Sequence, residues 1–206
     1  MERSLLYQIN TRVLLQELGA ALGRPAALED IPDSTLEGLA AQGIEWVWLL
    51  GVWQTGTVGP NVSRTRTELR AACMECLPDL REEDICGSPF AIRSYTVHRD
   101  LGGDSALTGL RQRMKEHGLR LLLDFVPNHV APDHPWVDEH SEFFVRGTEE
   151  ALAREPQNFV RLRSKRGELI LAHGRDPHFA GWLDTVQMNY RHQAARQAMS
   201  GELSRI

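Results

Sequence analysis

Two stretches of the chain repeat one design, in which an amphipathic helix pattern ends at a glycine and an apolar strand follows. The first runs from Pro32 through Gly43 to Ile44–Leu50, and the second from Asp104 through Gly118 to Leu119–Val126. Strands that are apolar at nearly every position are typical of a parallel sheet with helices on its faces. With Leu5–Ile9 as an earlier strand, the sequence predicts three strands of an α/β fold with helices between them.

The boundaries of these helices are also predicted from local signals. Ser34 and Glu37 have the spacing of a capping box, so the first helix is expected to begin there. Asp104 or Ser105 is expected to cap the second helix, whose buried face would carry Leu107, Leu110 and Met114.

A third helix pattern spans Asn189 to Ile206. Its apolar positions recur at helical spacing and are Tyr190, Ala194, Ala198 or Met199, Leu203 and Ile206. The pattern continues to the last residue, which favours a chain that is cut before a fourth strand.

Composition excludes several classes of protein. The net charge of −5 argues against a nucleic-acid partner, which usually requires a basic surface. The longest apolar runs are far shorter than the ~20 residues of a membrane span, so no membrane partner is expected. Because the N-terminus lacks the pattern of a signal peptide, a cytoplasmic location is predicted.

Three cysteines are too few for a disulfide framework. Cys73 and Cys76 have the C-x-x-C spacing of zinc and redox sites. No second ligand pair completes a zinc site, and free thiols are therefore the favoured interpretation.

Two long segments interrupt the α/β pattern. One extends from Gly51 to Tyr95 and is rich in Arg and Glu, and the other extends from Pro132 to Trp182 and is rich in charge, His and Pro. Insertions of this length at strand ends are usually functional loops or small subdomains.

The segment Asp124-Phe-Val-Pro-Asn-His129, at the end of the third strand, resembles the first sequence motif of glycoside hydrolase family 13, the α-amylase family. Other segments resemble the family in the same order along the chain: Leu6–Ile9, Trp46–Leu49, Ser94–Gly103 and Asp184–Tyr190. The resemblance implies a TIM (β/α)8 barrel that is interrupted after its third strand by a B domain.

Applied to this chain, the resemblance divides it into three parts. Residues 1–131 would form the N-terminal part of the barrel (domain A), residues 132–188 the B-domain insertion, and residues 189–206 the third barrel helix. A complete barrel typically needs ~250 residues before insertions. The expected fold is therefore the first three β/α units of an incomplete barrel.

The resemblance also implies an activity on α-glucosidic bonds by a retaining mechanism, as a glycoside hydrolase or a transglycosylase. Retaining enzymes use two carboxyl groups about 5–5.5 Å apart. In the family these groups lie on later strands, which would follow Ile206. We therefore expect an N-terminal fragment that is inactive by itself. The acidic residues of the second insertion, Asp133, Asp138, Glu139 and Glu142, are interpreted as solvated.

Four residues are implied to serve the substrate site. His129 matches the histidine that hydrogen-bonds the sugar ring, and Tyr95 matches the aromatic residue that stacks on it. Packing in the core or at the barrel rim is the alternative for both. Asp124 and Asn128 are interpreted as supporting residues. Trp53 and Trp136 are either sugar platforms or packing residues, and the expected partner is an α-glucan or α-glucoside.

The same motifs also bear on whether the chain binds a metal ion. Many family members bind calcium through the asparagine that matches Asn128, but here Gln187 stands where an aspartate is common. A neutral amide is a poorer calcium ligand than a carboxylate. We therefore predict no metal or cofactor, with calcium through Asn128 as the alternative. The loop spacing of His129, His134 and His140 lacks the fixed geometry of a zinc site.

A second hypothesis is a complete, non-catalytic half-barrel that serves as a carbohydrate-binding or interaction module. The codons after Ile206 distinguish the two, because an apolar strand ending in Arg-x-Asp within ~20 codons favours the enzyme. A doubly wound nucleotide-binding domain is disfavoured, since no G-x-G-x-x-G follows any strand.

Overall fold

The computed structural model describes residues 4–165 and 167–206, and they divide into two compact units. The first, the sheet unit, consists of the chain up to Gln54 together with Thr96–Phe125. The second, the insertion unit, consists of Thr55–Tyr95 and Val126–Ile206. These boundaries differ from the predicted division at residues 131 and 188, which stays a prediction.

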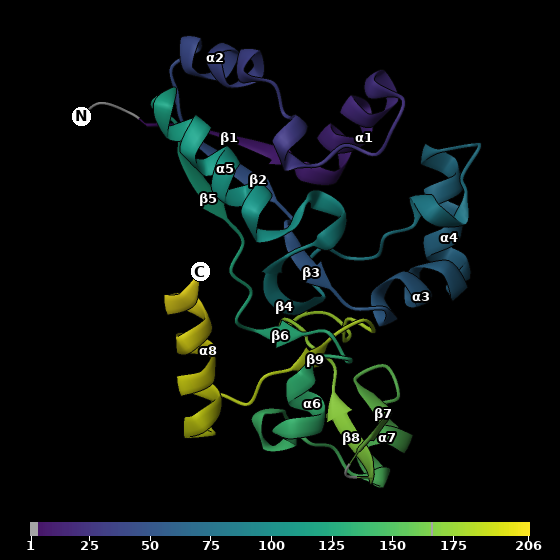
Figure 1. The fold of residues 1–206 in the computed structure, drawn as a ribbon. Helices are drawn as coiled ribbons and strands as arrows, with labels where there is room; N and C mark the ends of the chain where they lie inside the picture. Colours follow the sequence, from purple (N-terminus) through teal and green to yellow (C-terminus); the bar gives the residue numbers. More distant parts are fainter. Residues whose placement is uncertain (1–3, 166) are drawn as a thin grey trace. The chain divides into compact units, whose positions relative to one another are not determined.

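The sheet unit contains the three predicted parallel strands. Strands β1 (Leu5–Asn10), β2 (Ile44–Leu50) and β5 (Arg120–Leu123) form one sheet with β2 in the middle (Figure 1). Both pairings are parallel. The sheet is open among the described residues, as expected for the first three units of a barrel.

Strand β5 ends earlier than the predicted Val126. The backbone oxygen of Asp124 accepts a hydrogen bond from the Trp53 indole N–H at 2.7 Å. The carbonyl group of Asp124 is thus bonded to a side chain and not to a neighbouring strand. The pairing of β5 with β2 stops at Leu123.

Three α-helices belong to the sheet unit: α1 (Thr11–Leu22), α2 (Asp33–Ala41) and α5 (Gly103–Glu116). Two 3-10 helices, η1 (Leu28–Asp30) and η3 (Arg99–Leu101), accompany them. The side chains that pack the core of this unit include Leu36, Leu39, Val47, Leu49, Ala106, Leu110 and Met114. Leu107, which was expected on the buried face of α5, is half-buried.

Both predicted helix caps are wrong. The N-cap of α2 is Pro32, so Ser34 already lies inside the helix and forms no capping box. The N-cap of α5 is Gly102, whose φ of 96° is strained for other residues. The Asp104 carboxylate instead accepts from the Val97 N–H at 2.7 Å, so this carboxylate ties the helix to the preceding strand.

The first insertion begins with strand β3 (Trp53–Thr55), which pairs with β4 (Ile92–Val97), and the boundary between the units passes through both strands. Between them lie the helices α3 (Val58–Thr65) and α4 (Thr67–Cys76) and the 3-10 helix η2 (Glu82–Asp84).

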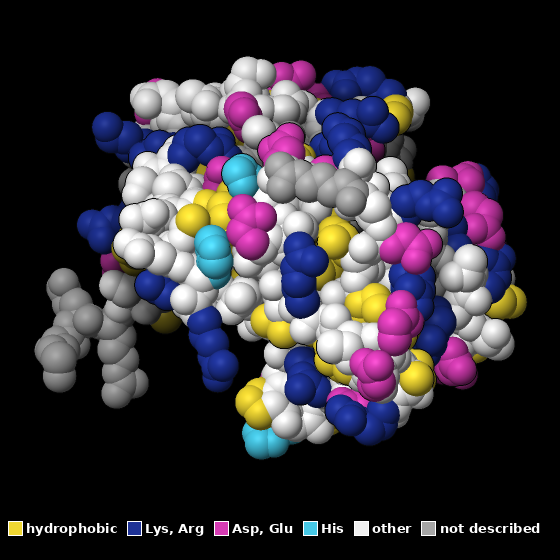
Figure 2. Space-filling model, turned by 90° about the horizontal axis from the view of Figure 1, so that it is seen from below, with side chains coloured by type: hydrophobic (Ala, Val, Ile, Leu, Met, Phe, Trp, Pro, Cys, Tyr) yellow, Lys and Arg dark blue, Asp and Glu magenta, His cyan; other side chains and the backbone are white. Residues whose placement is uncertain are grey.

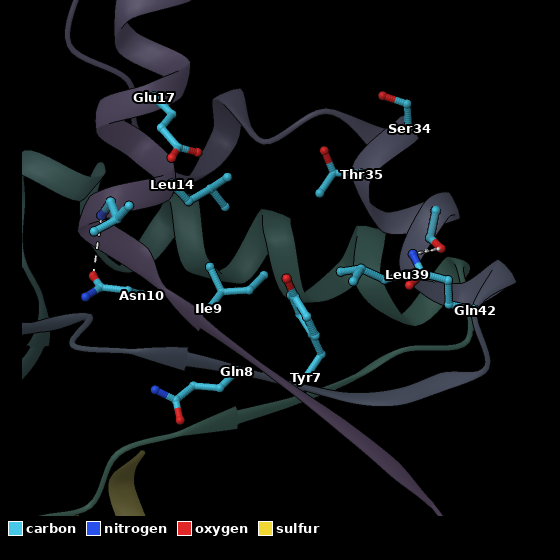
Figure 3. A pocket seen from close by; sticks show the side chains of 12 residues that line it. Tyr7, Gln8, Ile9, Asn10, Leu14, Glu17, Ser34, Thr35, Leu39 and Gln42 are labelled. Atoms are coloured by element: carbon cyan, nitrogen blue, oxygen red, sulfur yellow. Dashed lines mark hydrogen bonds between the residues drawn. The ribbon is translucent and has the colours of Figure 1, made fainter.

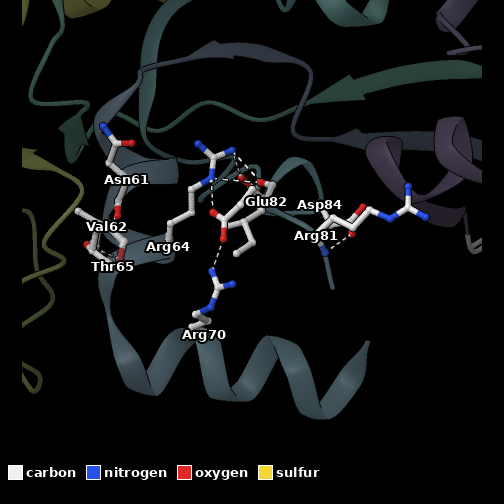
Figure 4. A network of polar contacts seen from close by, with 9 residues as sticks. Asn61, Val62, Arg64, Thr65, Arg70, Arg81, Glu82 and Asp84 are labelled. Atoms are coloured by element: carbon white, nitrogen blue, oxygen red, sulfur yellow. Dashed lines mark hydrogen bonds and ion pairs between the residues drawn. The ribbon is translucent and has the colours of Figure 1, made fainter. Parts of the chain in front are cut away.

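A polar network holds this insertion together (Figure 4). Arg64 donates to the backbone oxygens of Glu82 and Ile85, at 2.9 and 3.1 Å. Arg70 pairs with the Glu82 carboxylate at 2.5 Å. Cys73 and Cys76 lie on α4 with free thiols.

The second insertion contains two antiparallel strand pairs. Strand β6 (His129–Val130) pairs with β9 (Val186–Gln187), and β7 (Phe159–Ser164) forms a hairpin with β8 (Gly167–Ala172). Its helices are α6 (Pro135–Glu139), η4 (Ser141–Phe143) and α7 (Glu149–Arg154).

The last helix, α8 (Gln193–Arg205), begins later than the predicted Asn189. The Tyr190 hydroxyl donates to the Pro127 backbone oxygen at 2.5 Å, which holds the residues before the helix against another segment. Ala195 and Met199 form its buried face, whereas Leu203 and Ile206 are exposed. The predicted helix is thus present, and it ends at Arg205, one residue before the predicted Ile206.

Charges are mixed on the surface. Figure 2 shows acidic and basic side chains interspersed over one face. Among the described residues, no helix has the length and apolar character needed to cross a membrane.

Candidate functional site

The four predicted site residues follow or belong to the ends of two strands. Asp124 comes directly after β5, Asn128 and His129 lie a few residues beyond, and Tyr95 lies in β4. Asp124 belongs to the sheet unit, whereas the other three belong to the insertion unit. Their surroundings are therefore described unit by unit.

Asp124 is held by hydrogen bonds to β2 and the segment after it. Its Oδ1 accepts from the Trp48 indole N–H at 3.0 Å, and its Oδ2 accepts from the Gly51 N–H at 2.6 Å. The side chain is only 7% exposed. Both carboxylate oxygens thus have partners within the protein, which suits a supporting residue.

Trp53 is 3% exposed, and it donates its indole N–H to Asp124. Burial on this scale favours packing over a sugar platform for this tryptophan.

Tyr95 is also buried, with 3% of its surface exposed. Its hydroxyl oxygen accepts a hydrogen bond from the Val126 N–H at 2.9 Å, and Arg205 donates to its backbone oxygen at 3.0 Å. A sugar can stack on this ring only if the atoms that cover it move. The stacking role stays a prediction.

His129 is 7% exposed and lies in β6. Burial lowers the pKa of the imidazole to about 4, although a hydrogen bond to the Phe90 backbone acts in the opposite direction. The ring is therefore neutral at pH 7, with one nitrogen as donor and the other as acceptor. A Cβ at Gly174 would lie 2.6 Å from the His129 Cβ, so glycine is needed for this close approach.

Trp182 is an aromatic residue beside His129 that was not predicted from the sequence. Its ring centroid lies 5.1 Å from that of His129, with the planes tilted by 59°. At 39% exposure, it presents part of an aromatic surface to solvent next to the histidine. In the sequence, Trp182 carries no signal besides its place near the end of the insertion.

The surroundings of Asn128 do not fit a calcium ion. Its backbone oxygen and its Oδ1 both accept from the Gln187 Nε2, each at 2.9 Å. Calcium requires six to eight oxygen ligands, usually with carboxylates among them. Here an N–H donor occupies the position facing both oxygens, and no group of three or more His, Cys, Asp or Glu side chains in the described chain is arranged to hold a metal.

The other histidines of the second insertion have separate partners. His134 packs against Trp136 with ring centroids 4.6 Å apart, and His140 stacks on Phe143 at 4.7 Å. The T-shaped contact of Trp136 with Phe143, at 5.6 Å, places that tryptophan in the same aromatic cluster. This arrangement favours packing for Trp136 and gives no zinc geometry.

Two of the four acidic residues interpreted as solvated are in fact hydrogen-bonded to backbone. Asp133 accepts from the Thr57 N–H at 2.8 Å, and Asp138 accepts from the Lys165 N–H at 3.0 Å. Glu142 is exposed and contacts His140 at 3.3 Å. Asp133 and Asp138 are half-buried and therefore less solvated than interpreted, because these loops need acceptors for their N–H groups.

A hollow of about 390 Å³ lies in the sheet unit between β1, α1 and α2 (Figure 3). Tyr7, Leu14 and Leu39 contribute apolar lining, and Glu17 and Gln42 contribute polar lining. None of the four predicted site residues is among the described residues that line it. This hollow is therefore separate from the predicted substrate residues.

Comparison with known proteins identifies the family. The family model for the alpha amylase catalytic domain matches residues 90–195, which is more than half of the chain. The match includes Tyr95, Asp124, Asn128 and His129.

Several curated proteins are similar over shorter stretches. An alpha-1,4-glucan:maltose-1-phosphate maltosyltransferase of Cereibacter sphaeroides is 41% identical over 63 residues, covering 28% of this chain and 9% of that protein. The enzyme of the same name from Bifidobacterium longum is 32% identical over 123 residues, covering 57% of this chain and 15% of that protein. The chain thus spans only about a tenth to a seventh of the length of these relatives.

Solved structures share the fold. An alpha-amylase from Lactobacillus plantarum aligns with a TM-score of 0.61 at 20% identity, covering 97% of this chain and 35% of that one. Isomaltulose synthase from Klebsiella sp. LX3 aligns with a TM-score of 0.62 at 14% identity, covering 98% and 32%. Together with the family match, the parallel order β1-β2-β5 shows that this chain belongs to the α-amylase family, glycoside hydrolase family 13.

Proposed function

We propose that this chain is the N-terminal part of an enzyme that acts on the α-glucosidic bonds of an α-glucan by a retaining mechanism, as a hydrolase or a transglycosylase. The observation that carries the proposal is the catalytic-domain match over residues 90–195. The names of the maltosyltransferase relatives support an α-1,4-glucan as the substrate class.

We further propose that the two catalytic carboxyl groups are not among these 206 residues. A retaining mechanism needs one carboxylate that attacks the anomeric carbon and one carboxylic acid that protonates the leaving oxygen. Asp124, Asp133 and Asp138 each accept a hydrogen bond from backbone N–H groups, which favours structural roles for them. The chain by itself is therefore expected to be inactive.

In this proposal, His129 contacts a sugar hydroxyl and the exposed part of Trp182 contributes an apolar surface for the sugar ring. The neutral imidazole supports the first role, and the 39% exposure of Trp182 supports the second. Because the ring of His129 also bonds the Phe90 backbone, a sugar hydroxyl has to share or replace that bond. Asp124 has a structural role, because its carboxylate accepts from the Trp48 indole N–H of the neighbouring strand. The Tyr95 hydroxyl holds the backbone at Val126 by accepting from its N–H.

The test is a titration of the [15N]histidine-labelled chain with maltoheptaose, followed by NMR. We expect saturable shifts of the His129 ring and no shift of His117, which caps α5 in the sheet unit. Cellohexaose, a β-glucan of similar size, should shift the signals of neither histidine. Saturable maltoheptaose binding that leaves His129 unchanged would contradict its assignment and favour a binding module with a different site.

The same preparation tests the catalytic part of the proposal. Maltoheptaose and an aryl α-glucoside should not be hydrolysed or transferred. Turnover that co-purifies with the chain and disappears in the variant Asp124→Ala would contradict the placement of the catalytic carboxylates.

A further inference from the structure

Two side-chain amides and the backbone N–H and C=O groups of one residue, Arg175, form a closed ring of hydrogen bonds in the insertion unit. Gln187 donates from Nε2 to both oxygens of Asn128, at 2.9 Å each. The Gln187 Oε1 accepts from the Arg175 N–H at 3.2 Å, and the Asn128 Nδ2 donates to the Arg175 backbone oxygen at 3.5 Å. The ring joins three segments that are distant in sequence.

Backbone groups determine which way both amides point. A backbone N–H can only donate and a carbonyl oxygen can only accept. The Arg175 N–H therefore requires the Gln187 oxygen on its side, while the Asn128 carbonyl requires the Gln187 nitrogen on the other. With that nitrogen in place, Asn128 must present its Oδ1 to Gln187, which leaves its Nδ2 to face the opposite direction.

The Asn128 Nδ2 reaches His129, and its distance to the His129 Nδ1 is 3.2 Å. Because an amide nitrogen donates, Nδ1 must accept, and the proton of the neutral ring must then lie on Nε2. We propose that Gln187 is a positioning residue, which acts through Asn128 to hold His129 as the Nε2–H tautomer.

This inference rests on the proposed function for its meaning. A ring held in this tautomer has a donor, not an acceptor, at Nε2, and a sugar hydroxyl would share this N–H with the Phe90 backbone or take it over. The chemistry of glutamine is specific here. A carboxylate at position 187 could accept from the Arg175 N–H, but it could not donate to the two Asn128 oxygens. Asn128 would then have to turn its amide over, with Oδ1 facing His129.

The test is the 15N spectrum of the histidine-labelled full chain without sugar, at a pH where the ring is neutral. The His129 signals are assigned by their loss in His129→Gln. In the wild type, we expect Nε2 in the protonated range and Nδ1 in the unprotonated range. In Gln187→Glu, we expect these assignments to exchange, since the proton moves to Nδ1.

Gln193→Glu is the matched control, because it makes the same change at an exposed residue of the same unit. It should leave the tautomer of His129 unchanged. Asn128→Asp is a second test of the proposal if Gln187→Glu folds poorly. The new carboxylate would still accept from Gln187, but on its other side it could only accept from His129 and would therefore require a proton on Nδ1. The same exchange of the Nδ1 and Nε2 signals is expected.

A wild-type ring protonated at Nδ1 would overturn the proposal, and so would a tautomer unchanged in both Gln187→Glu and Asn128→Asp. Because the spectra are recorded without sugar, these outcomes are independent of whether His129 binds an α-glucan. Failure of the maltoheptaose titration with the expected tautomer would contradict only the proposed function.

Discussion

Trp48 donates its indole N–H to the Oδ1 of Asp124 over 3.0 Å, and this bond joins the central strand β2 to the residue that follows β5. The other carboxylate oxygen accepts from the Gly51 N–H, directly after β2. One buried carboxylate thus satisfies donors from the end of the neighbouring strand. The motif aspartate of this chain is, in this respect, a structural residue.

Replacing Asp124 by asparagine should destabilise the sheet unit. Two donors converge on the carboxylate, and an amide can accept from one of them but must point its own N–H₂ at the other. An unpaired buried donor costs about 1–3 kcal/mol, so the free energy of unfolding should fall by about that amount. Urea unfolding followed by circular dichroism measures the change.

Trp48→Phe is the control for this prediction, since it removes a single donor and leaves the Gly51 bond in place. Once the smaller volume of phenylalanine is considered, Trp48→Phe should lower the free energy of unfolding by less than Asp124→Asn does. If Asp124→Asn unfolds at the same urea concentration as the wild type, the carboxylate does not hold the strand ends.

Tyr95→Phe separates the hydroxyl of this residue from its ring. The change leaves the Val126 N–H without its acceptor and should lower the free energy of unfolding by about 1–3 kcal/mol. Stacking on a sugar depends on the ring face and would be retained in phenylalanine. Melting temperature and maltoheptaose affinity, measured on the same preparation, should therefore show lower stability and unchanged affinity. An unchanged melting temperature with weaker binding would instead assign the hydroxyl to the sugar.

Stability should fall as the pH is lowered from about 6.5 to about 4. Burial lowers the pKa values of both His129 and His134 to about 4, whereas an unfolded histidine titrates near 6.5. Between these values the unfolded state binds more protons than the folded state, so the free energy of unfolding decreases as pH falls. The loss is on the order of 3 kcal/mol for each histidine.

Chemical unfolding at a series of pH values measures this dependence. His134→Asn is the informative variant, because asparagine can replace the histidine as the N-cap of α6 and does not titrate. Its slope over this pH range should be smaller than the wild-type slope, and a slope should remain because burial also lowers the pKa values of His98, His129 and His173. A wild-type stability that is flat between pH 6.5 and pH 4 would contradict the burial of both rings as neutral groups.

Calcium should not stabilise the chain, because the Gln187 amide already donates to both Asn128 oxygens. A cation bound at a hundred times its Kd would add about 2.7 kcal/mol, which raises the melting temperature by several degrees. We therefore expect equal melting temperatures in excess Ca²⁺ and in excess EDTA.

The variant Gln187→Asp provides the positive comparison. It removes the competing N–H and adds a carboxylate beside the same oxygens, so a calcium-dependent rise in melting temperature is expected for it. A calcium-dependent rise in the melting temperature of the wild type would show that the ion displaces the Gln187 amide from the Asn128 oxygens.

The predicted elements were correct where the signal is local. Strand β2 spans the predicted Ile44–Leu50 without change, and α5 carries Leu110 and Met114 on its buried face. Apolar periodicity is a property of consecutive residues, so it can be recognised without knowing which other segments lie nearby in the fold. The caps at Ser34 and Asp104 were wrong because a side chain that can cap a helix can equally bond elsewhere, as Asp104 does with Val97.

The sequence by itself therefore determined the parallel α/β pattern, the family and the position of the motif residues at the strand ends. Tertiary structure decided what those residues contact. Trp48 and Asp124 are separated by 76 positions in sequence, and Asn128 and Gln187 by 59. A hydrogen bond forms only when donor and acceptor come within about 3 Å in the correct orientation, and no local pattern of side chains encodes that distance.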